Sequence, residues 1–404
     1  MTPSALKGIT VLEFCSKVSG AYCTKLMADM GAEVIKIEPP SCGDDARRKG
    51  PFPNDLPHPE KSGHFAYINS NKKGITLDPW KSTGKEIFLK LVESVDILVE
   101  DASPKEMEEL GFDYETLKKS NPGLIMASIT AFGRSGPYKD FQARPLNISH
   151  IAGQGNLLPI PTFDIKRPPV MAGGNKGGYD VGITALVPIL AAYFWKRTSG
   201  KGQFIEISRQ EALLSMQRVE AVNYANTKQN LSRSPAANRG FLGGIMPCKD
   251  GYICILAPQD HQWDSIVRMM GEPDWTKEDI CKDRFARADH TEKINKYLLE
   301  WMKDKTRKEI VDKGQAESCP VSAVNSAEDI CESEQFIARE FFTEIDHPFM
   351  GKFKFPTAPY KFSKTPWKLD RVAPLLGEHN EEVLCNKLGY EKSDLVKLRE
   401  AEII

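Results

Sequence analysis

The sequence predicts an α/β protein: a large domain built on a parallel, doubly wound sheet, with a smaller α+β domain. Three observations support this. The chain has 404 residues, which is long enough for two domains. Its first part alternates apolar strand patterns with helical ones, as βαβ units do. Near residue 243 the pattern changes to a hairpin followed by charged amphipathic helices.

The first βαβ unit spans residues 8–38. ITVLEF is a short apolar strand, SKVSGAYCTKLMADMG is a helix with a glycine exit, and AEVIKIE is an alternating strand. Parallel strands joined in this way place ligands at their carboxyl ends. We therefore expect the loop at residues 15–20 to border a binding site.

The rest of the first half continues the alternation. Residues 39–63 are rich in proline, glycine and charge and predict a long functional loop. Further strands are expected near residues 65–79, 95–100 and 124–133, with helices at 86–93, 104–111 and 114–122.

The segment 170–203 stands out by its glycines, with Gly173, Gly174, Gly177 and Gly178 close together. A long apolar run follows, from Val181 to Trp195, and a basic glycine-rich exit ends it. We expect a tight loop, then a buried helix with Asp180 as its N-cap, then a glycine stop. The loop matches neither GxGxxG nor the GxxxxGK[ST] phosphate loop. Its glycines let the backbone come close either to a ligand or to packed protein.

The second half predicts the smaller domain. A strand and a long helix cover residues 203–226, and a polar linker follows. Residues 243–258 form a hairpin that turns at Lys249-Asp250-Gly251. From about 332 the chain reads as irregular and proline-rich, with a final helix pair. The expected limits are 1–226 for the first part of the large domain, 227–331 for the small domain and 332–404 for the return to the large one.

The amino-acid composition disfavours several classes of partner and binding site. A net charge of −1 and a near-neutral pI do not favour nucleic acid or a membrane surface as the main partner. We expect no apolar run as long as a membrane span, no signal peptide and a cytoplasmic location. Nine scattered cysteines without a C-x-x-C pair, and seven dispersed histidines, favour reduced thiols over disulfides or a metal site. No cofactor is expected.

Several blocks, in order, carry a family resemblance. They are LEFCSKVSGAYCTKLMADMGAEVIKIEPP, NSNKKGITLD, residues 95–138, the central helix with SGKGQ, KDGYICILAPQDHQW, and LGEHNEEVLCNKLGYEKSDLVKLREAEII. They resemble the class III CoA-transferases, the family of formyl-CoA:oxalate and carnitine CoA-transferases. The resemblance implies a Rossmann-like large domain made from both chain ends, and two subunits interlocked like rings. It also implies transfer of CoA between carboxylic acids through an aspartyl thioester.

The nucleophile of that family is missing here. The pattern D-x-x-x-G, counted back from Gly182, places Gly178 in the aspartate position, and glycine has no carboxylate. Asp180 is two residues away, about 6–7 Å in an extended loop, whereas nucleophilic attack tolerates errors of about 1 Å. Other positions that carry tyrosine, arginine or lysine in some relatives hold Arg144, Glu109, Pro39 and Ser103 here.

Binding residues can be carried over from the resemblance. Four residues lie in segments that contact CoA in relatives, or else are solvated groups at loop tips: Lys17, Asn71, Lys72 and Lys73. Arg134 is a fifth candidate for CoA binding, which either points to the cleft or caps a turn.

The resemblance and the missing aspartate together favour a catalytically silent subunit. Its partner would be a paralogous subunit with an intact aspartate, in a heterodimer or heterotetramer. The substrates would be an acyl-CoA and a carboxylic acid, as in succinyl-CoA:(R)-benzylsuccinate CoA-transferase of anaerobic toluene degradation. Coenzyme A thioester is then a substrate of the complex.

Three alternatives stay open. One is an active homodimer that uses Asp180 as its nucleophile. A second is an α-methylacyl-CoA racemase-like enzyme, although Arg144 and Pro145 occupy its His-Asp pair. A third is a binding or regulatory protein that has kept the fold without the chemistry.

Overall fold

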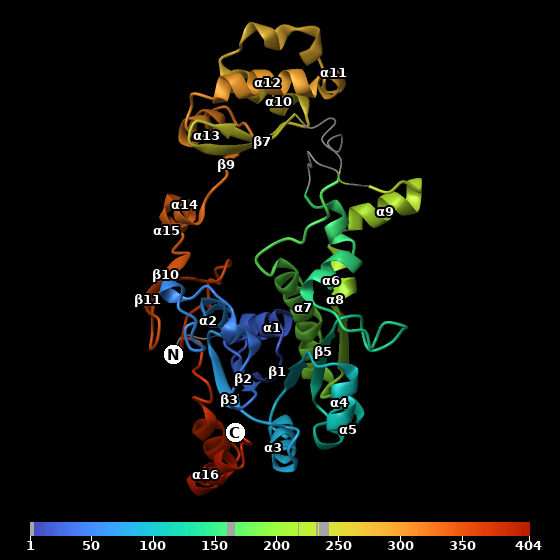
Figure 1. Cartoon of the computed structure of the whole chain (residues 1–404), viewed down its shortest axis with the longest axis vertical. Coiled ribbons are helices and arrows are strands. Elements are labelled where there is room, and N and C mark those ends of the chain that lie inside the picture. Colours follow the sequence, from blue (N-terminus) through green and yellow to red (C-terminus); the bar gives the residue numbers. More distant parts are fainter. Residues whose placement is uncertain (1–3, 160–165, 217, 232, 234–241) are drawn as a thin grey trace. The chain divides into compact units, whose positions relative to one another are not determined.

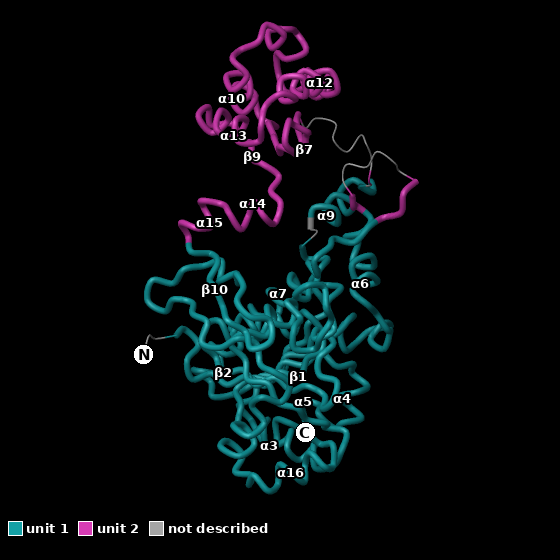
Figure 2. The backbone as a smooth tube through the Cα atoms, turned by 60° about the vertical axis from the view of Figure 1, so that its left-hand side comes forward, with its two compact units in different colours: residues 1–156, 170–231, 340–404 teal, residues 157–169, 232–339 magenta. Residues whose placement is uncertain are grey.

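The computed structural model describes residues 4–159, 166–216, 218–231, 233 and 242–404. The chain divides into two units (Figure 2). Unit 1 comprises Met1–Asn156, Val170–Leu231 and Glu340–Ile404, and unit 2 comprises Leu157–Pro169 and Ser232–Arg339. The small domain expected at 227–331 thus compares with a unit of 232–339 to which residues 157–169 also belong.

Unit 1 is built on a six-stranded sheet in the order β3-β2-β1-β4-β5-β6, with every neighbouring pair parallel. Its strands are β1 Thr10–Phe14, β2 Glu33–Glu38, β3 Lys72–Thr76, β4 Ile97–Glu100, β5 Ile125–Thr130 and β6 Phe204–Ser208. In register, Leu12 of β1 faces Ile35 on one side and Leu98 on the other. The order reverses between β1 and β4, as in a doubly wound fold, so the predicted fold class is confirmed.

Helices cover both faces of this sheet (Figure 1). They are α1 Val18–Asp29, α3 Ser82–Glu93, α4 Pro104–Leu110, α5 Tyr114–Ser120, α6 Pro145–Ile151, α7 Lys176–Ser199 and α8 Arg209–Ser215. Helix α2 Gly63–Ile68 packs on α1, and α9 Arg218–Thr227 projects away from the sheet (Figure 1). Successive residues of a strand point to opposite faces, so the apolar strands supply two cores. Val11 belongs to the core that contains α1, α6, α7 and α8, and Leu12 to the core that contains α3 and α5.

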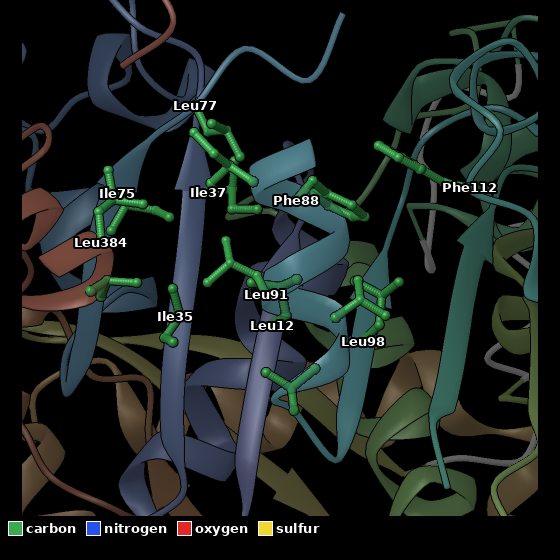
Figure 3. Close-up of a cluster of buried hydrophobic side chains, with 14 of the residues drawn as sticks. Leu12, Ile35, Ile37, Ile75, Leu77, Phe88, Leu91, Leu98, Phe112 and Leu384 are labelled. Atoms are coloured by element: carbon green, nitrogen blue, oxygen red, sulfur yellow. The ribbon is translucent and has the colours of Figure 1, made fainter. Parts of the chain in front are cut away.

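The C-terminal segment completes the second core. Phe88 and Leu91 of α3 pack with Leu12, Ile35 and neighbouring strand residues (Figure 3). The same cluster contains buried residues of the π-helical turn η7 Glu382–Lys387, of α16 Lys392–Glu400 and of the chain end: Val383, Leu384, Leu395, Leu398, Ile403 and Ile404. The large domain therefore uses both ends of the chain, as the resemblance implied, and the expected final helix pair is present.

The segment after residue 332 is more regular than predicted. Phe342–His347 (β10) and Gly351–Pro356 (β11) form an antiparallel hairpin within unit 1. The prediction of irregular structure there was wrong, because prolines flanking short strands hide them from a pattern search. Gly351, at φ 69°, occupies the left-handed conformation that a tight hairpin needs.

Unit 2 contains the predicted hairpin. Gly243–Cys248 (β7) pairs with Gly251–Leu256 (β8), and Val321–Ala323 (β9) adds a third antiparallel strand. Its helices are α10 Asp260–Met270, α11 Arg284–Asp289, α12 Thr291–Met302, α13 Arg307–Ala316, α14 Ala327–Glu332 and α15 Glu334–Ala338. Buried Ile253, Trp263, Ile266 and Leu298 share one core, so the predicted amphipathic helices are present and pack on the predicted hairpin.

Helix α7 begins earlier than predicted. Asn175, at φ 58°, is its N-cap, so Gly177 and Gly178 lie inside the first turn and Asp180 lies in the second. The prediction of Asp180 as N-cap was wrong, because the two glycines tolerate helical geometry here. At its other end Gly200, at φ 70°, stops the helix as expected.

Helix α7 also corrects the expectation that no apolar run is long enough for a membrane span. Its 24 residues include an 18-residue window of mean hydropathy 1.3, which meets that test by length and composition. A core helix meets the same test. Val181, Ala185, Ile189 and Ala192 are buried in the core that α7 shares with α1 and the sheet.

Candidate functional site

The candidate site lies where the strand order reverses. Strand β1 ends at Phe14 and strand β4 ends at Glu100. The side chain of Asp101, directly after β4, binds the loop that follows β1. One carboxylate oxygen of Asp101 accepts a hydrogen bond from the backbone N–H of Ser16 at 2.8 Å, and the other accepts from Lys17 at 2.7 Å. The buried carboxylate thereby fixes the loop that leads into α1. The sequence prediction that the loop at residues 15–20 borders a site is consistent with this position.

A pocket with a volume of about 120 Å³ opens beside this loop. All of its walls come from unit 1: the β1–α1 loop, the 45–49 segment, α6, the start of α7 and the start of α8. Apolar side chains form much of the lining, namely Val18, Ile148, Met171, Val181 and Leu213. The pocket therefore joins elements that are far apart in the sequence.

Basic groups dominate the polar part of the lining, which contains Lys17, Lys49, Arg144, Lys176 and Arg209. The one acidic lining residue that the described chain contributes is Asp45. Asp45 forms an ion pair with Arg48 at 2.6 Å, and the hydrogen bond from Arg48 lowers the pKa of its carboxyl. Excess positive charge around a pocket attracts anions.

Three buried polar atoms of the lining have no hydrogen-bond partner among the described residues: Ser19 Oγ, Ser149 Oγ and Arg209 Nε. Ser19 is 2% exposed and Ser149 is 3% exposed. A buried hydroxyl without a partner costs about 1–3 kcal/mol, so buried polar groups are nearly always paired. The pocket thus holds unused hydrogen-bonding capacity.

Gly178 also lines the pocket, and it lies against Val18 at the start of α1. A Cβ built on Gly178 would lie 3.0 Å from both Cβ and Cγ1 of Val18, closer than side-chain carbons ordinarily approach. One turn later, a Cβ on Gly182 would lie 2.8 Å from the carbonyl oxygen of Ser19. The two glycines let α7 pack closely on α1, and that contact fills the space that a side chain at 178 would need.

Asp180 does not belong to the pocket lining. Its carboxylate forms an ion pair with Lys176 at 2.5 Å, and its backbone carbonyl accepts a hydrogen bond from Thr184. Residues two apart on an α-helix point about 200° apart around the axis. Positions 178 and 180 were estimated to lie about 6–7 Å apart in an extended loop. Because both lie in a helix, side chains at the two positions instead point in nearly opposite directions around its axis.

The predicted CoA-contacting residues separate into two groups. Asn71 is tied to the C-terminal segment, since its side chain donates to Lys368 O and accepts from the backbone N–H groups of Asp370 and Arg371. Lys73 forms ion pairs with Glu33 and Glu382 at 2.7 and 2.8 Å. Both side chains are thus engaged in holding the two ends of the chain together.

Lys72 is fully buried, and its amino group contacts Glu13, Ala21 O and Asn69. It has no exposed surface with which to contact a ligand. Arg134 lies 3.5 Å from buried Glu100 and also contacts Ser128. Of the five predicted residues, Lys17 is the one that lines the pocket, where its amino group donates to Ser16 Oγ.

The remaining family positions are also placed. Arg144 precedes α6, and both it and Pro145 line the pocket. Ser103 is the N-cap of α4, and Glu109 on that helix is exposed beside Lys105. Pro39 lines a second cavity at the carboxyl ends of β1, β2 and β3, together with Phe14, Trp80, Lys81 and Arg399.

A buried charge network supports the strand ends near the site. Lys36 contacts Glu13 at 2.8 Å and Asp44 at 2.7 Å, and Lys72 contacts the other oxygen of Glu13 at 2.8 Å. Burial alone would raise the pKa of Glu13, but the two lysines lower it to about 2. Burial lowers the pKa of Lys72 to about 8 against the attraction of Glu13.

The sequence analysis missed two pocket residues, Ser149 and Arg209, whereas Ser19 and Lys49 lie in the predicted loops at 15–20 and 39–63 without having been singled out. Arg209 directly follows β6, and residues at the carboxyl ends of parallel strands are the expected site residues. That rule could have identified it. Ser149 lies within a short helix, and no spacing in the sequence distinguishes it from other serines.

Comparisons with known proteins agree on the family. Residues 6–380 match the model of CoA-transferase family III. Formyl-CoA:oxalate CoA-transferase of Rhodopseudomonas palustris (strain BisB18) is 30% identical, over 98% of this chain and 96% of the relative. The Streptomyces coelicolor protein of the same name is also 30% identical, over the full length of both chains.

Solved structures show the same fold. A CAIB/BAIF family protein from Brucella suis superposes with a TM-score of 0.83 at 26% identity, covering 96% of this chain and all of that one. A hypothetical protein from Mycobacterium tuberculosis gives 0.80 at 23% identity, over 95% and 100% of the chains. With its match over residues 6–380 and its full-length relatives, the chain belongs to CoA-transferase family III.

Proposed function

We propose that this chain is a catalytically silent subunit of a heteromeric CoA-transferase, in which a paralogous subunit supplies the nucleophilic aspartate. The complex would move CoA from an acyl-CoA such as succinyl-CoA to a carboxylic acid such as (R)-benzylsuccinate. The substrates and the cytoplasmic location are carried over from the resemblance. The silent role rests on the geometry of this chain.

The observation that carries the proposal is the contact between Gly178 and Val18. The residue in the nucleophile position has no side chain, and α1 occupies the space beside it. Asp180, the nearest carboxylate, is outside the pocket lining and paired with Lys176. An acyl-transfer mechanism of this family needs a carboxylate that reaches the thioester carbonyl, and neither position offers one.

Asp45 is the other carboxylate to weigh, because it lines the pocket. It follows β2, on the 3-10 turn Asp45–Arg48, and its side chain is about half exposed in the ion pair with Arg48. A lowered pKa makes a carboxylate a weaker nucleophile. We therefore do not assign Asp45 as the nucleophile, and an acyl or CoA adduct on Asp45 would contradict the proposal.

Exposed apolar side chains on unit 1 support a partner subunit. On α7 and α9, Val187, Phe194, Val219 and Val222 are all more than half exposed. These side chains are available for contact with a partner subunit. Interlocked subunits, as the resemblance implies, would cover such a surface.

The experiment compares the chain alone with the chain plus a paralogue that retains D-x-x-x-G. CoA exchange between an acyl-CoA and a free acid is measured for each preparation. The proposal expects no exchange by this chain alone and exchange by the co-purified complex. Exchange by the lone chain that Asp180→Asn abolishes would instead establish an active homodimer. Absence of any paralogue from pull-downs, with no exchange, would favour a binding protein.

A further inference from the structure

We propose that Glu100 and Arg134 form a pH-sensitive latch, which fastens residues 132–142 to the six-stranded sheet more tightly as the pH rises through neutrality. These residues belong to the connection between β5 and α6, and most of them are exposed. The connection leads directly into α6, which carries part of the pocket lining. The inference concerns the order of this loop and does not depend on the proposed function.

Arg134 is the polar anchor of the loop. Of residues 132–142, it alone makes hydrogen bonds or ion pairs with other elements of the described chain. Its backbone N–H donates to the carboxylate of Glu206 on β6. Its guanidinium lies 3.3 Å from Ser128 Oγ on β5 and 3.5 Å from Glu100 Oε1 at the end of β4. One side chain thus connects the loop to three neighbouring strands.

The remaining contacts of the loop allow it to leave the sheet. In the described part of the chain, residues 135–142 form backbone hydrogen bonds only with one another. Gly133 and Gly136, at φ 90° and 82°, lie on either side of Arg134 and give the backbone the freedom of a hinge. The aromatic ring of Phe132, which packs on the core before the first of these glycines, would keep the loop attached at its base.

Glu100 supplies the pH sensitivity, because it is fully buried and Arg134 is the cation that it contacts. The side chain of Glu100 is 0% exposed and that of Arg134 is 15% exposed. Burial disfavours the charged form of the carboxyl and raises the pKa of Glu100 to about 7. If Arg134 moved away, an ionised Glu100 would stay buried without its cation, which is costly. The ionised form therefore favours the latched loop.

The other groups that face Glu100 do not move with the loop. The groups that act on its carboxyl are the Ser128 hydroxyl, the Ala102 N–H and the like charge of Asp101. The Cys15 thiol, after β1, is also near: burial raises its pKa, and Glu100 is among the carboxylates that add to this rise. All of these groups belong to the sheet or to the segments that directly follow its strands. Release of the loop would remove the attraction of Arg134 and leave the rest in place.

The direction of the pH effect follows from this difference. Release of Arg134 raises the pKa of Glu100 further, so the released loop is the state that binds more protons. By linkage, a rise in pH favours the latched loop, beginning near pH 7 and ending at the higher pKa of the released state. Below pH 7 the carboxyl is neutral in both states, and the latch is at its weakest.

Hydrogen exchange, followed by mass spectrometry of peptides from the full-length chain, tests the latch. Exchange is measured at about pH 6 and about pH 8.5, and each rate is divided by the intrinsic rate of the same amide at that pH. We expect protection across residues 134–142 to rise roughly 3- to 10-fold at the higher pH, because one pKa unit corresponds to a tenfold ratio of the two states. Strand β3, on the far side of the sheet, should show no such rise.

Substitutions separate the latch from a structural role. Glu100→Gln keeps the shape of the side chain without a titratable carboxyl, so protection of the loop should be the same at both pH values. Arg134→Gln should lower protection at pH 8.5 to its value at pH 6, whereas Arg134→Lys keeps the positive charge and should keep part of the rise. Glu108→Gln, which removes an exposed carboxylate on α4, is the matched control and should keep the full rise.

Three results would overturn the inference. The first is loop protection that stays constant between the two pH values, and the second is protection that falls at the higher pH because the released state hydrates Glu100. The third is a rise that persists in Glu100→Gln or in Arg134→Gln. If Glu100→Gln does not fold, Arg134→Gln decides the question, because its side chain belongs to the loop and not to the buried core.

Discussion

The Cβ position of Gly178 lies 3.0 Å from Cβ and Cγ1 of Val18. Gly178, which stands in the nucleophile position, therefore packs directly against Val18 of α1. A glycine at 178 allows the two helices to approach, and a branched side chain at 18 fills the gap. Restoring a carboxylate at position 178 would require a change at position 18 as well.

This coupling predicts a change of sign in a double-mutant cycle. Gly178→Ala alone should destabilise the chain by about 1–3 kcal/mol, as overpacking does. With Val18→Gly in place both contacting carbons are removed, and the same substitution should stabilise by up to about 1 kcal/mol through helix propensity. Urea unfolding of the four proteins measures the coupling.

Gly177→Ala is the matched control for that cycle. Its Cβ would meet Leu213 side-chain carbons at 3.5 and 3.6 Å, which is ordinary contact, and it lies one residue away in the same helix. Its effect should be neutral or stabilising with either residue at 18. Additive effects at 178 and 18 would disprove the packing argument.

Gly182→Ala should be more damaging, and truncation of a side chain should not relieve it. The added Cβ would lie 2.8 Å from the backbone carbonyl oxygen of Ser19, so α1 and α7 would have to separate. We expect a loss of about 2–3 kcal/mol, toward the upper part of the overpacking range. A loss that Val18→Gly removes would show that the two glycines do not act at separate points along the helix pair.

The buried carboxylate of Glu13 predicts a large stability effect away from the pocket. Glu13→Gln leaves Lys36 and Lys72 buried without a shared partner, and breaking such a network costs about 3–5 kcal/mol. Glu33→Gln is the control, because its partners Lys73 and Lys387 are partly exposed, and it should cost less than about 1 kcal/mol. Similar losses in the two variants would contradict this difference.

Glu100 predicts a pH dependence of stability. Burial, opposed by Ser128 and Arg134, raises the pKa of Glu100 to about 7 from 4.5. Between these values the unfolded chain has released the proton and the folded chain has kept it. The titration of Glu100 therefore lowers the free energy of unfolding as pH rises from about 4.5 to 7. Above pH 7 its contribution to that free energy changes little.

Glu100→Gln should remove that slope and raise the free energy of unfolding at pH 8 by roughly 3 kcal/mol, while an amide oxygen can still accept from Ala102 N–H. Unfolding at a series of pH values measures it. Glu108→Gln, exposed on α4, should leave the slope intact. A Glu100→Gln profile that overlays the wild-type one would refute the assignment.

Much of the fold was predictable because strand and helix periods are local. The βαβ unit at residues 8–38 and the hairpin turning at Asp250 both follow from patterns of a few residues. The start of α7 was not predictable in this way. Glycines at 177 and 178 indicate a loop in isolation, and their helical geometry depends on packing against Val18 and Leu213.

The sequence indicated where the candidate site lies, but it did not indicate which residues line it. The loop after β1 was expected to border it, and Lys17 does. Lys72 and Asn71 were expected to contact a ligand. Instead, the Lys72 amino group forms an ion pair with Glu13, and the Asn71 side-chain amide forms hydrogen bonds with the C-terminal segment. Partners more than about 40 residues away in sequence decide such roles, and no local pattern records them.

The most direct test is the mass of the intact chain after incubation alone with succinyl-CoA and quenching. A covalent aspartyl intermediate would add an acyl or CoA group, and peptide mapping would place it. Our account predicts no added mass on this chain and an adduct on the catalytic partner when the two are mixed. An adduct on Asp180 or Asp45 of the lone chain would contradict it.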